Sequence, residues 1–125
     1  MADERKSYVL KEGDGVGTVK VAEEVVAVIA GLAATEVRGV ASLAGGITNQ
    51  LVSRKGYKAL SKGVKIGIEG KLVAVELTLN LDYGYSIPEV GGAVQQKVKS
   101  TIETMTGLTV TEVVVNVADI AAQGH

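Results

Sequence analysis

The chain contains no cysteine, phenylalanine or tryptophan, and it has only one histidine, one proline and four tyrosines. Without cysteine it can form no disulfide, no zinc–thiolate site and no thiol nucleophile. The single histidine is the last residue, His125, so internal residues cannot supply a Ser-His-Asp triad or a typical zinc site. The net charge of −1 provides no general attraction to nucleic acid or anionic lipid. No active site can be recognised from these residues.

Long hydrophobic runs are also lacking. The longest mostly apolar stretch, Val25–Ala34, is about half the length of a membrane-spanning helix. The first six residues are Met-Ala-Asp-Glu-Arg-Lys, which form no apolar signal region, so we expect no secretory signal.

What the chain does contain is 46% hydrophobic residues in 125 positions, enough for one globular domain. The core must be built from valine, isoleucine, leucine and alanine. We expect a single domain over residues 16–118, a flexible N-terminal tail at 1–15 and a C-terminal tail at 119–125.

The first half of the domain predicts a short strand at 18–21, a helix at 22–36 and a strand at 37–43. Glu23 and Glu24 lie in the first helical turn, where the helix dipole favours negative charge. This helix is apolar around most of its circumference, which indicates burial on more than one side. Residues 44–62 form a long insert in which the spacing of apolar residues allows a short helix, and we expect either an ordered excursion with a binding role or a mobile loop.

The second half has clearer patterns. Strict alternation of apolar and polar residues over 64–69 and 73–82 predicts a hairpin turning at Glu69-Gly70-Lys71. Ser86-Ile87-Pro88-Glu89 has the form of a capping box, and a helical stripe follows. The stripe comprises Ile87, Val90, Val94, Val98, Ile102 and Met105. Gly107 is expected to end this helix, and a strand follows over 108–117.

These elements predict an α+β fold with two layers, in which two main helices pack on one mixed or antiparallel sheet of about four to five strands.

Catalytic and phosphate-binding motifs are weak. Gly13-x-Gly15-x-Gly17 lacks the strand-to-helix context of a dinucleotide fingerprint. Glu23, Glu24, Glu76 and Asp82 are interpreted as solvated surface. We therefore expect no cofactor and no bound metal.

Three features are candidates for interaction. Arg54, Lys55 and Lys58 surround Tyr57 in the insert, and this basic cluster either contacts RNA, lipid or an acidic partner or only aids solubility. Tyr83 and Tyr85 flank a glycine at a strand end and mark either an interface or packing over the turn. Gly91 and Gly92 should each cost their helix roughly 1 kcal/mol relative to alanine, and close approach of another backbone would compensate for that cost.

Three stretches, in this order and spacing, carry a family resemblance. They are residues 19–31 with 36–40, residues 60–65, and the motif Tyr83-Gly84-Tyr85-Ser86-Ile87-Pro88-Glu89-Val90 continuing to residue 117. Over residues 16–118 the chain resembles the alkaline-shock-protein family of Gram-positive bacteria, also called the Gls-type general-stress family. Gly91 and Gly92 depart from the larger residues that the family pattern leads us to expect.

The resemblance implies a cytoplasmic, non-enzymatic protein linked to alkaline and cell-envelope stress. It also implies self-association, or attachment at the membrane through a small integral membrane protein, or control of a fatty-acid-synthesis enzyme. We therefore expect a scaffold or adaptor that acts by protein–protein contacts and forms homo-oligomers. The alternatives are a regulator that docks on that biosynthetic enzyme and a nucleic-acid-binding module that uses the basic 54–62 loop. The lack of phenylalanine and tryptophan counts against the nucleic-acid alternative.

Overall fold

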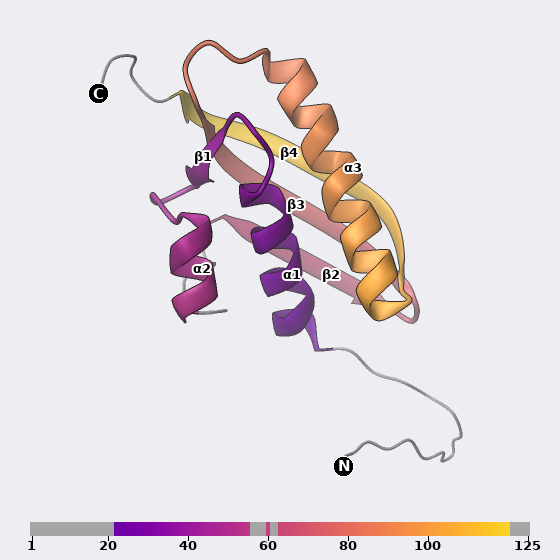
Figure 1. Ribbon diagram of the computed structural model, residues 1–125. Helices are drawn as coiled ribbons and strands as arrows, with labels where there is room; N and C mark the ends of the chain where they lie inside the picture. The colour runs from indigo at the N-terminus through magenta and orange to yellow at the C-terminus, as the bar shows by residue number, and fades with distance from the viewer. Residues whose placement is uncertain (1–21, 56–59, 61–62, 121–125) are drawn as a thin grey trace, which may run out of the picture.

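The computed structural model describes residues 22–55, 60 and 63–120. The predicted N-terminal tail, the predicted strand at 18–21 and the candidates Tyr57 and Lys58 lie outside these residues. The elements, in chain order, are α1 (Glu23–Thr35), β1 (Val40–Leu43), α2 (Asn49–Lys55), β2 (Val64–Glu69), β3 (Leu72–Leu81), α3 (Ile87–Thr106) and β4 (Thr109–Ile120) (Figure 1).

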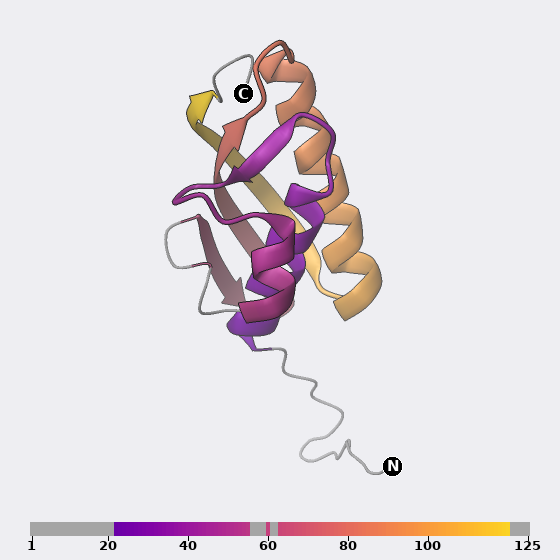
Figure 2. The same cartoon turned by 60° about the vertical axis from the view of Figure 1, so that its left-hand side comes forward.

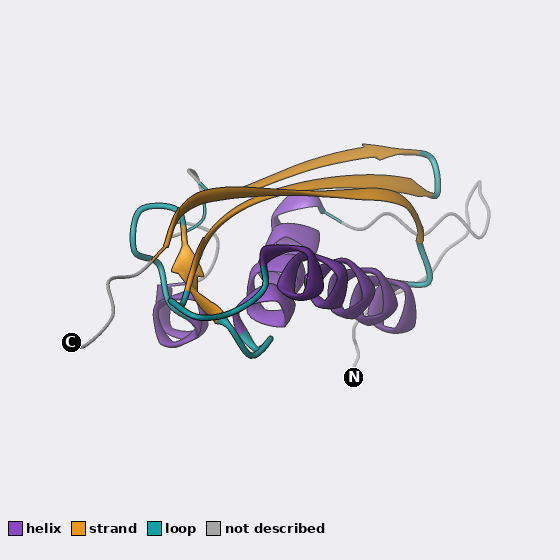
Figure 3. Cartoon of the chain, turned by 90° about the horizontal axis from the view of Figure 1, so that it is seen from above, coloured by secondary structure: helices purple, strands orange, loops and turns teal. Residues whose placement is uncertain are grey.

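The predicted α+β fold is confirmed. The strands form one mixed sheet, and the helices lie on one of its faces (Figure 3). α1 and α3 lie side by side in the helical layer, and α2 packs against α1 (Figure 2). Asn49 joins the two helices, because its Nδ2 donates to the carbonyl oxygen of Leu32 at 3.2 Å and to Thr35 Oγ1 at 2.9 Å. The insert is therefore an ordered excursion where the structure describes it, and it contains a short helix.

β3 is the central strand. β4 pairs with it in parallel along its whole length, from Leu72 opposite Thr109 to Leu81 opposite Ile120. The other edge of β3 is shared end to end by two antiparallel strands, β2 along residues 72–77 and β1 along residues 79–81. α3 is the crossover that a parallel β3–β4 pair requires. Among the described strands β4 pairs only with β3, so it forms an edge of the sheet.

Local chemistry explains where α3 begins and ends. Ser86 Oγ accepts a hydrogen bond from the Glu89 N–H at 3.4 Å, as the capping-box pattern predicts. Gly107 adopts a φ of 76°, and its N–H donates to the Glu103 carbonyl oxygen, which confirms the left-handed helix end. The hairpin between β2 and β3 also turns where predicted, at Gly70 with a φ of 62°.

The core lies between the sheet and the two long helices. The helix-facing side of β3 is almost completely buried, and so is the middle of the α3 stripe. These residues are Val73, Val75, Leu77, Leu79 and Leu81 from β3 and Val90, Val94, Val98 and Ile102 from α3.

Four element predictions need correction. The strand expected at 37–43 begins only at Val40. β4 runs to Ile120, past the predicted end at 117 and into the first two residues of the predicted C-terminal tail. The two ends of the α3 stripe, Ile87 and Met105, are exposed rather than buried like the middle of the stripe. The expected burial of α1 on several sides also fails at Val25, which is half exposed.

Candidate interaction surfaces

An apolar surface lies between the first half of α1 and the end of α3. It is a shallow hollow of about 490 Å³ with Glu24 at its rim. We call it the α1 patch, and its apolar residues are Val25, Val28, Ile29, Leu32 and Met105. Val25 is 50% exposed and Met105 is 66% exposed. Farther along the helix pair, Lys97 Nζ lies 3.5 Å from Glu36 Oε1, so the two helices run antiparallel.

The buried face of α1 is formed mostly by small residues, together with Val26 and Ile29. Ala27, Ala30 and Ala34 are at most 2% exposed. Gly31 also faces the core, and a Cβ built there would lie 3.0 Å from Leu60 Cδ2. Close packing of α1 at Gly31 therefore requires a small side chain there, whereas Val25 is half exposed.

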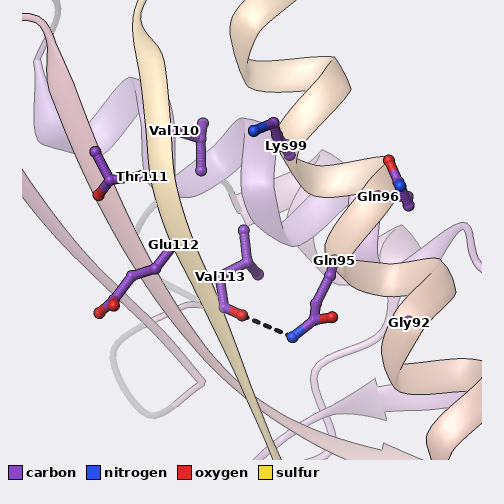
Figure 4. A pocket seen from close by; sticks show the side chains of 8 residues that line it. All are labelled: Gly92, Gln95, Gln96, Lys99, Val110, Thr111, Glu112 and Val113. Atoms are coloured by element: carbon purple, nitrogen blue, oxygen red, sulfur yellow. Dashed lines mark hydrogen bonds between the residues drawn. The ribbon is translucent and has the colours of Figure 1, made fainter.

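A second surface is the α3–β4 groove, a hollow of about 670 Å³ between one face of α3 and the outer edge of β4. Its residues are Gly92, Gln95, Gln96 and Lys99 from α3 and Val110, Thr111, Glu112 and Val113 from β4 (Figure 4). Two α3 side chains bind the edge of the strand. Gln95 Nε2 donates to the Val113 carbonyl oxygen at 3.0 Å, and Glu103 Oε2 accepts from the Val110 N–H at 2.9 Å.

The two glycines of α3 face open space. A Cβ built on Gly91 or Gly92 would have no heavy atom within 4 Å outside the helix's own nearby backbone. The close neighbour expected from the sequence is therefore not supplied by the described part of this chain. The glycines lower the stability of α3 without any packing gain inside the fold.

The predicted tyrosine pair lies at the turn between β3 and α3. Tyr83 and Tyr85 are both exposed, and Ile87 beside them is exposed as well. The Tyr85 ring nevertheless covers Gly39, because a Cβ built on Gly39 would lie 2.9 Å from Tyr85 Cδ2. Packing over the turn accounts for part of the Tyr85 ring, and the rest of this corner is open to solvent.

The described part of the basic cluster lies at the end of α2. Arg54 and Lys55 occupy its last turn and are exposed, whereas Val52 anchors the helix in the core. The candidate residues that the structure describes therefore lie in three places: the end of α2, the β3–α3 turn and α3. Of these, only Gly92 lines one of the two hollows described above.

Residues 22–55, 60 and 63–120 contain no cluster of three acidic or histidine side chains suited to a metal ion. In the same ranges, no helix has both the length and the apolar character needed to cross a membrane.

Sequence reasoning missed the α1 patch and the edge position of β4. The apolar circumference of α1 was a signal for the patch, because a helix apolar all round has more apolar surface than one core contact can cover. No signal in the sequence marks β4 as an edge strand, since its valines are equally typical of a buried strand.

Comparison with known proteins relates the chain to one protein family. The model of the alkaline-shock-protein family, which is described as having a cell envelope-related function, matches residues 11–122. Uncharacterized protein YqhY of Bacillus subtilis is 35% identical over 109 residues, which cover 87% of this chain and 81% of that protein. Uncharacterized protein YloU of the same organism is 32% identical, covering 78% of this chain and 82% of that protein. Uncharacterized protein Spy1614 of Streptococcus pyogenes is 30% identical, covering 87% and 92%. No solved structure matches the chain.

Proposed function

The chain belongs to the alkaline-shock-protein family, and from that premise we propose that it is a non-enzymatic adaptor in the response to alkaline and cell-envelope stress. It acts by binding other proteins and by associating with itself. A membrane-anchored protein holds it at the envelope, and the α1 patch is the surface that this partner contacts.

The observation that carries the proposal is the exposure of the α1 patch. Apolar surface removed from water contributes roughly 25 cal/mol per Å², so a contiguous apolar hollow favours a protein contact more than scattered exposed residues do. The patch combines residues from two helices, and Val25 and Val28 of α1 line it, whereas Val26 and the alanines of α1 are buried in the core.

The shape and charge of the α1 patch indicate the kind of partner. A groove between two antiparallel helices suits a third, amphipathic helix that inserts apolar residues at three- and four-residue steps. Glu24 at the rim and Glu23 beside it are both exposed at the start of α1. The partner helix therefore carries a basic residue next to its apolar stripe.

Genetic complementation in the native host tests the proposal. A strain lacking the gene should grow poorly under alkaline or cell-wall stress, and the wild-type chain should restore growth. Val25→Gln and Met105→Lys place polar groups in the patch without adding a negative charge beside Glu24, so both variants should fold and fail to complement. The matched control is Leu72→Gln, because Leu72 is 49% exposed and lies on the sheet rather than in the patch.

Circular dichroism and thermal melts of each purified variant establish that failure to complement is not failure to fold. Full complementation by folded Val25→Gln and Met105→Lys would remove the α1 patch from the proposal. Normal growth of the deletion strain under every envelope stress would contradict the proposed function itself.

A further inference from the structure

The outer edge of β4 has unusual features for a strand that ends a sheet. Among the described residues only β3 pairs with β4. Edge strands are normally protected by lysine, proline, β-bulges or short length. The pairing of β4 with β3 is irregular at Thr111 and at Ala118, and residues 112–117 between them pair regularly. The twelve residues of β4 contain no lysine, arginine or proline, and their only charges are Glu112 and Asp119.

Side chains of α3 cover only the first part of this edge. The Val110 N–H and the Val113 carbonyl oxygen point outward, since Glu103 and Gln95 bind them. Beyond the irregularity at Thr111, the N–H and C=O groups of one residue point the same way, and those of the next residue point the opposite way. The backbone groups of Val115 and Val117 therefore also point outward, and within the described chain no side chain hydrogen-bonds to them.

We propose that two copies of this chain pair through the outer edges of β4, antiparallel about a two-fold axis at Val115. The two sheets then form one continuous sheet with both helical layers on the same face. The inference rests on the self-association included in the proposed function, and it specifies the surface involved.

The backbone pattern selects this register. A two-fold axis at Val115 places Val115 opposite Val115 of the second copy and Val113 opposite its Val117. All of these residues have outward N–H and C=O groups, so each pair is of the hydrogen-bonded type. In the dimer, the Val113 carbonyl oxygen accepts a hydrogen bond from the N–H of the second copy's Val117. This bond replaces the one that Gln95 Nε2 donates in the monomer.

The side chains also suit this register. Val114, 41% exposed on the outer face, lies opposite Asn116 of the second copy, and Glu112 lies opposite Ala118. No two like charges face each other, and like charges placed directly opposite would destabilise the pair.

The glycines of α3 provide an independent reason to choose a second copy of this chain. Gln95 binds Val113 and Glu103 binds Val110, so α3 runs antiparallel to β4. Three helical residues rise about 4.5 Å and one strand residue spans about 3.3 Å, which places Gly92 level with Val114 to Val115. The two α3 helices would therefore come closest at Gly92, where the absence of a Cβ allows close approach.

A cysteine cross-link tests the axis directly. The chain contains no cysteine, so Val115→Cys introduces a single thiol. Hydrogen-bonded antiparallel pairs have Cα atoms about 5.5 Å apart, within the range that a disulfide spans. Under mild oxidation Val115→Cys should become a covalent dimer, whereas the control Leu72→Cys, at the start of β3, should remain largely monomeric.

A pair of double variants tests the register without cross-linking. Val114→Lys with Asn116→Lys places lysine opposite lysine twice in the dimer, and should raise the dimer Kd about tenfold or more. Val114→Lys with Asn116→Glu places opposite charges together and should restore a Kd near that of the wild type. Both positions are exposed in the monomer, and sedimentation velocity over a hundredfold concentration range measures each Kd.

The outcomes separate the surface from the function. Self-association with no cross-link at Val115→Cys and no difference between the two double variants would overturn the β4 pairing and leave the adaptor function standing. A wild-type chain that stays monomeric at all concentrations would also overturn it. Complementation by the wild type together with failure of the α1 patch variants would support the adaptor function in either case.

Discussion

Replacing both α3 glycines with alanine should make the monomer more stable. Gly91 and Gly92 lie inside a 20-residue helix, and an added Cβ at either position meets no atom within 4 Å. Alanine in a helix interior is favoured over glycine by about 0.8–1 kcal/mol per residue, mainly because the unfolded chain loses fewer conformations on folding.

The expected gain is therefore about 1.5–2 kcal/mol for Gly91→Ala combined with Gly92→Ala. In a domain of roughly 100 residues, 1 kcal/mol shifts the Tm by about 4–8 °C, so the double variant should melt roughly 6–16 °C higher. Thermal and urea unfolding followed by circular dichroism measure both quantities. The lowest usable protein concentration is required, because dimer formation would add concentration-dependent stability.

Gly84→Ala is the matched control. Its Cβ also meets nothing within 4 Å, but Gly84 has a φ of 93°, a conformation that costs other residues about 1–2 kcal/mol. The control should therefore lower stability although the same atom is added in equally open space. An unchanged or lower Tm for the Gly91 and Gly92 double variant would refute the reasoning, since it would mean that these positions contact the rest of the chain or lie outside a regular helix.

Three further changes should destabilise the fold. Gly39→Ala combines a positive φ with a Cβ placed 2.8 Å from Val90 Cγ2 and 2.9 Å from the Tyr85 ring, so urea unfolding should show a loss of about 2–4 kcal/mol. Ser86→Ala removes the exposed N-cap of α3, with an expected loss of about 0.5–1 kcal/mol and faster amide exchange in the first turn. Ile102→Ala deletes a completely buried side chain, which should cost about 2–5 kcal/mol and lower the Tm in calorimetry.

Each of these changes has an outcome that would contradict it. An unchanged free energy of unfolding for Gly39→Ala would show that the Tyr85 ring does not cover this turn. Slow exchange retained in Ser86→Ala would show that the cap does not hold the first turn. A loss below about 1 kcal/mol for Ile102→Ala would mean that the core collapses around the deleted side chain.

Interactions between near neighbours in the chain made α3 and the hairpin predictable. The Ser86 cap and the Gly107 helix end act within one or two turns, and the alternation of β2 and β3 follows from the pleat of a strand. The extent of β4 was less predictable, because Ala118, Asp119 and Ile120 carry no strand pattern. They are placed in the strand by pairing with the end of β3.

The exposure of the candidate interaction residues depended more strongly on the tertiary structure than the helices and strands did. Tyr83 and Tyr85 were found at an exposed corner as their sequence position suggested, since a turn between a strand and a helix lies at the surface. Met105 belongs to the same predicted helical stripe as Ile102, which is completely buried. Met105 itself is 66% exposed and lines the α1 patch beside the first half of α1.

The sequence by itself determined the elements of the second half, the absence of cysteine and internal histidine chemistry, and the family resemblance, all of which depend on residue types and short spacings. Only the tertiary structure decided which face of α1 is buried and which edge of the sheet remains open. Gly31 of α1 packs inward against Leu43 and Leu60, where an added Cβ would be crowded, whereas Val25 lies on the exposed side of the helix. β4 becomes an edge because β1 and β2 share the opposite side of β3, a pairing choice between segments distant in the chain.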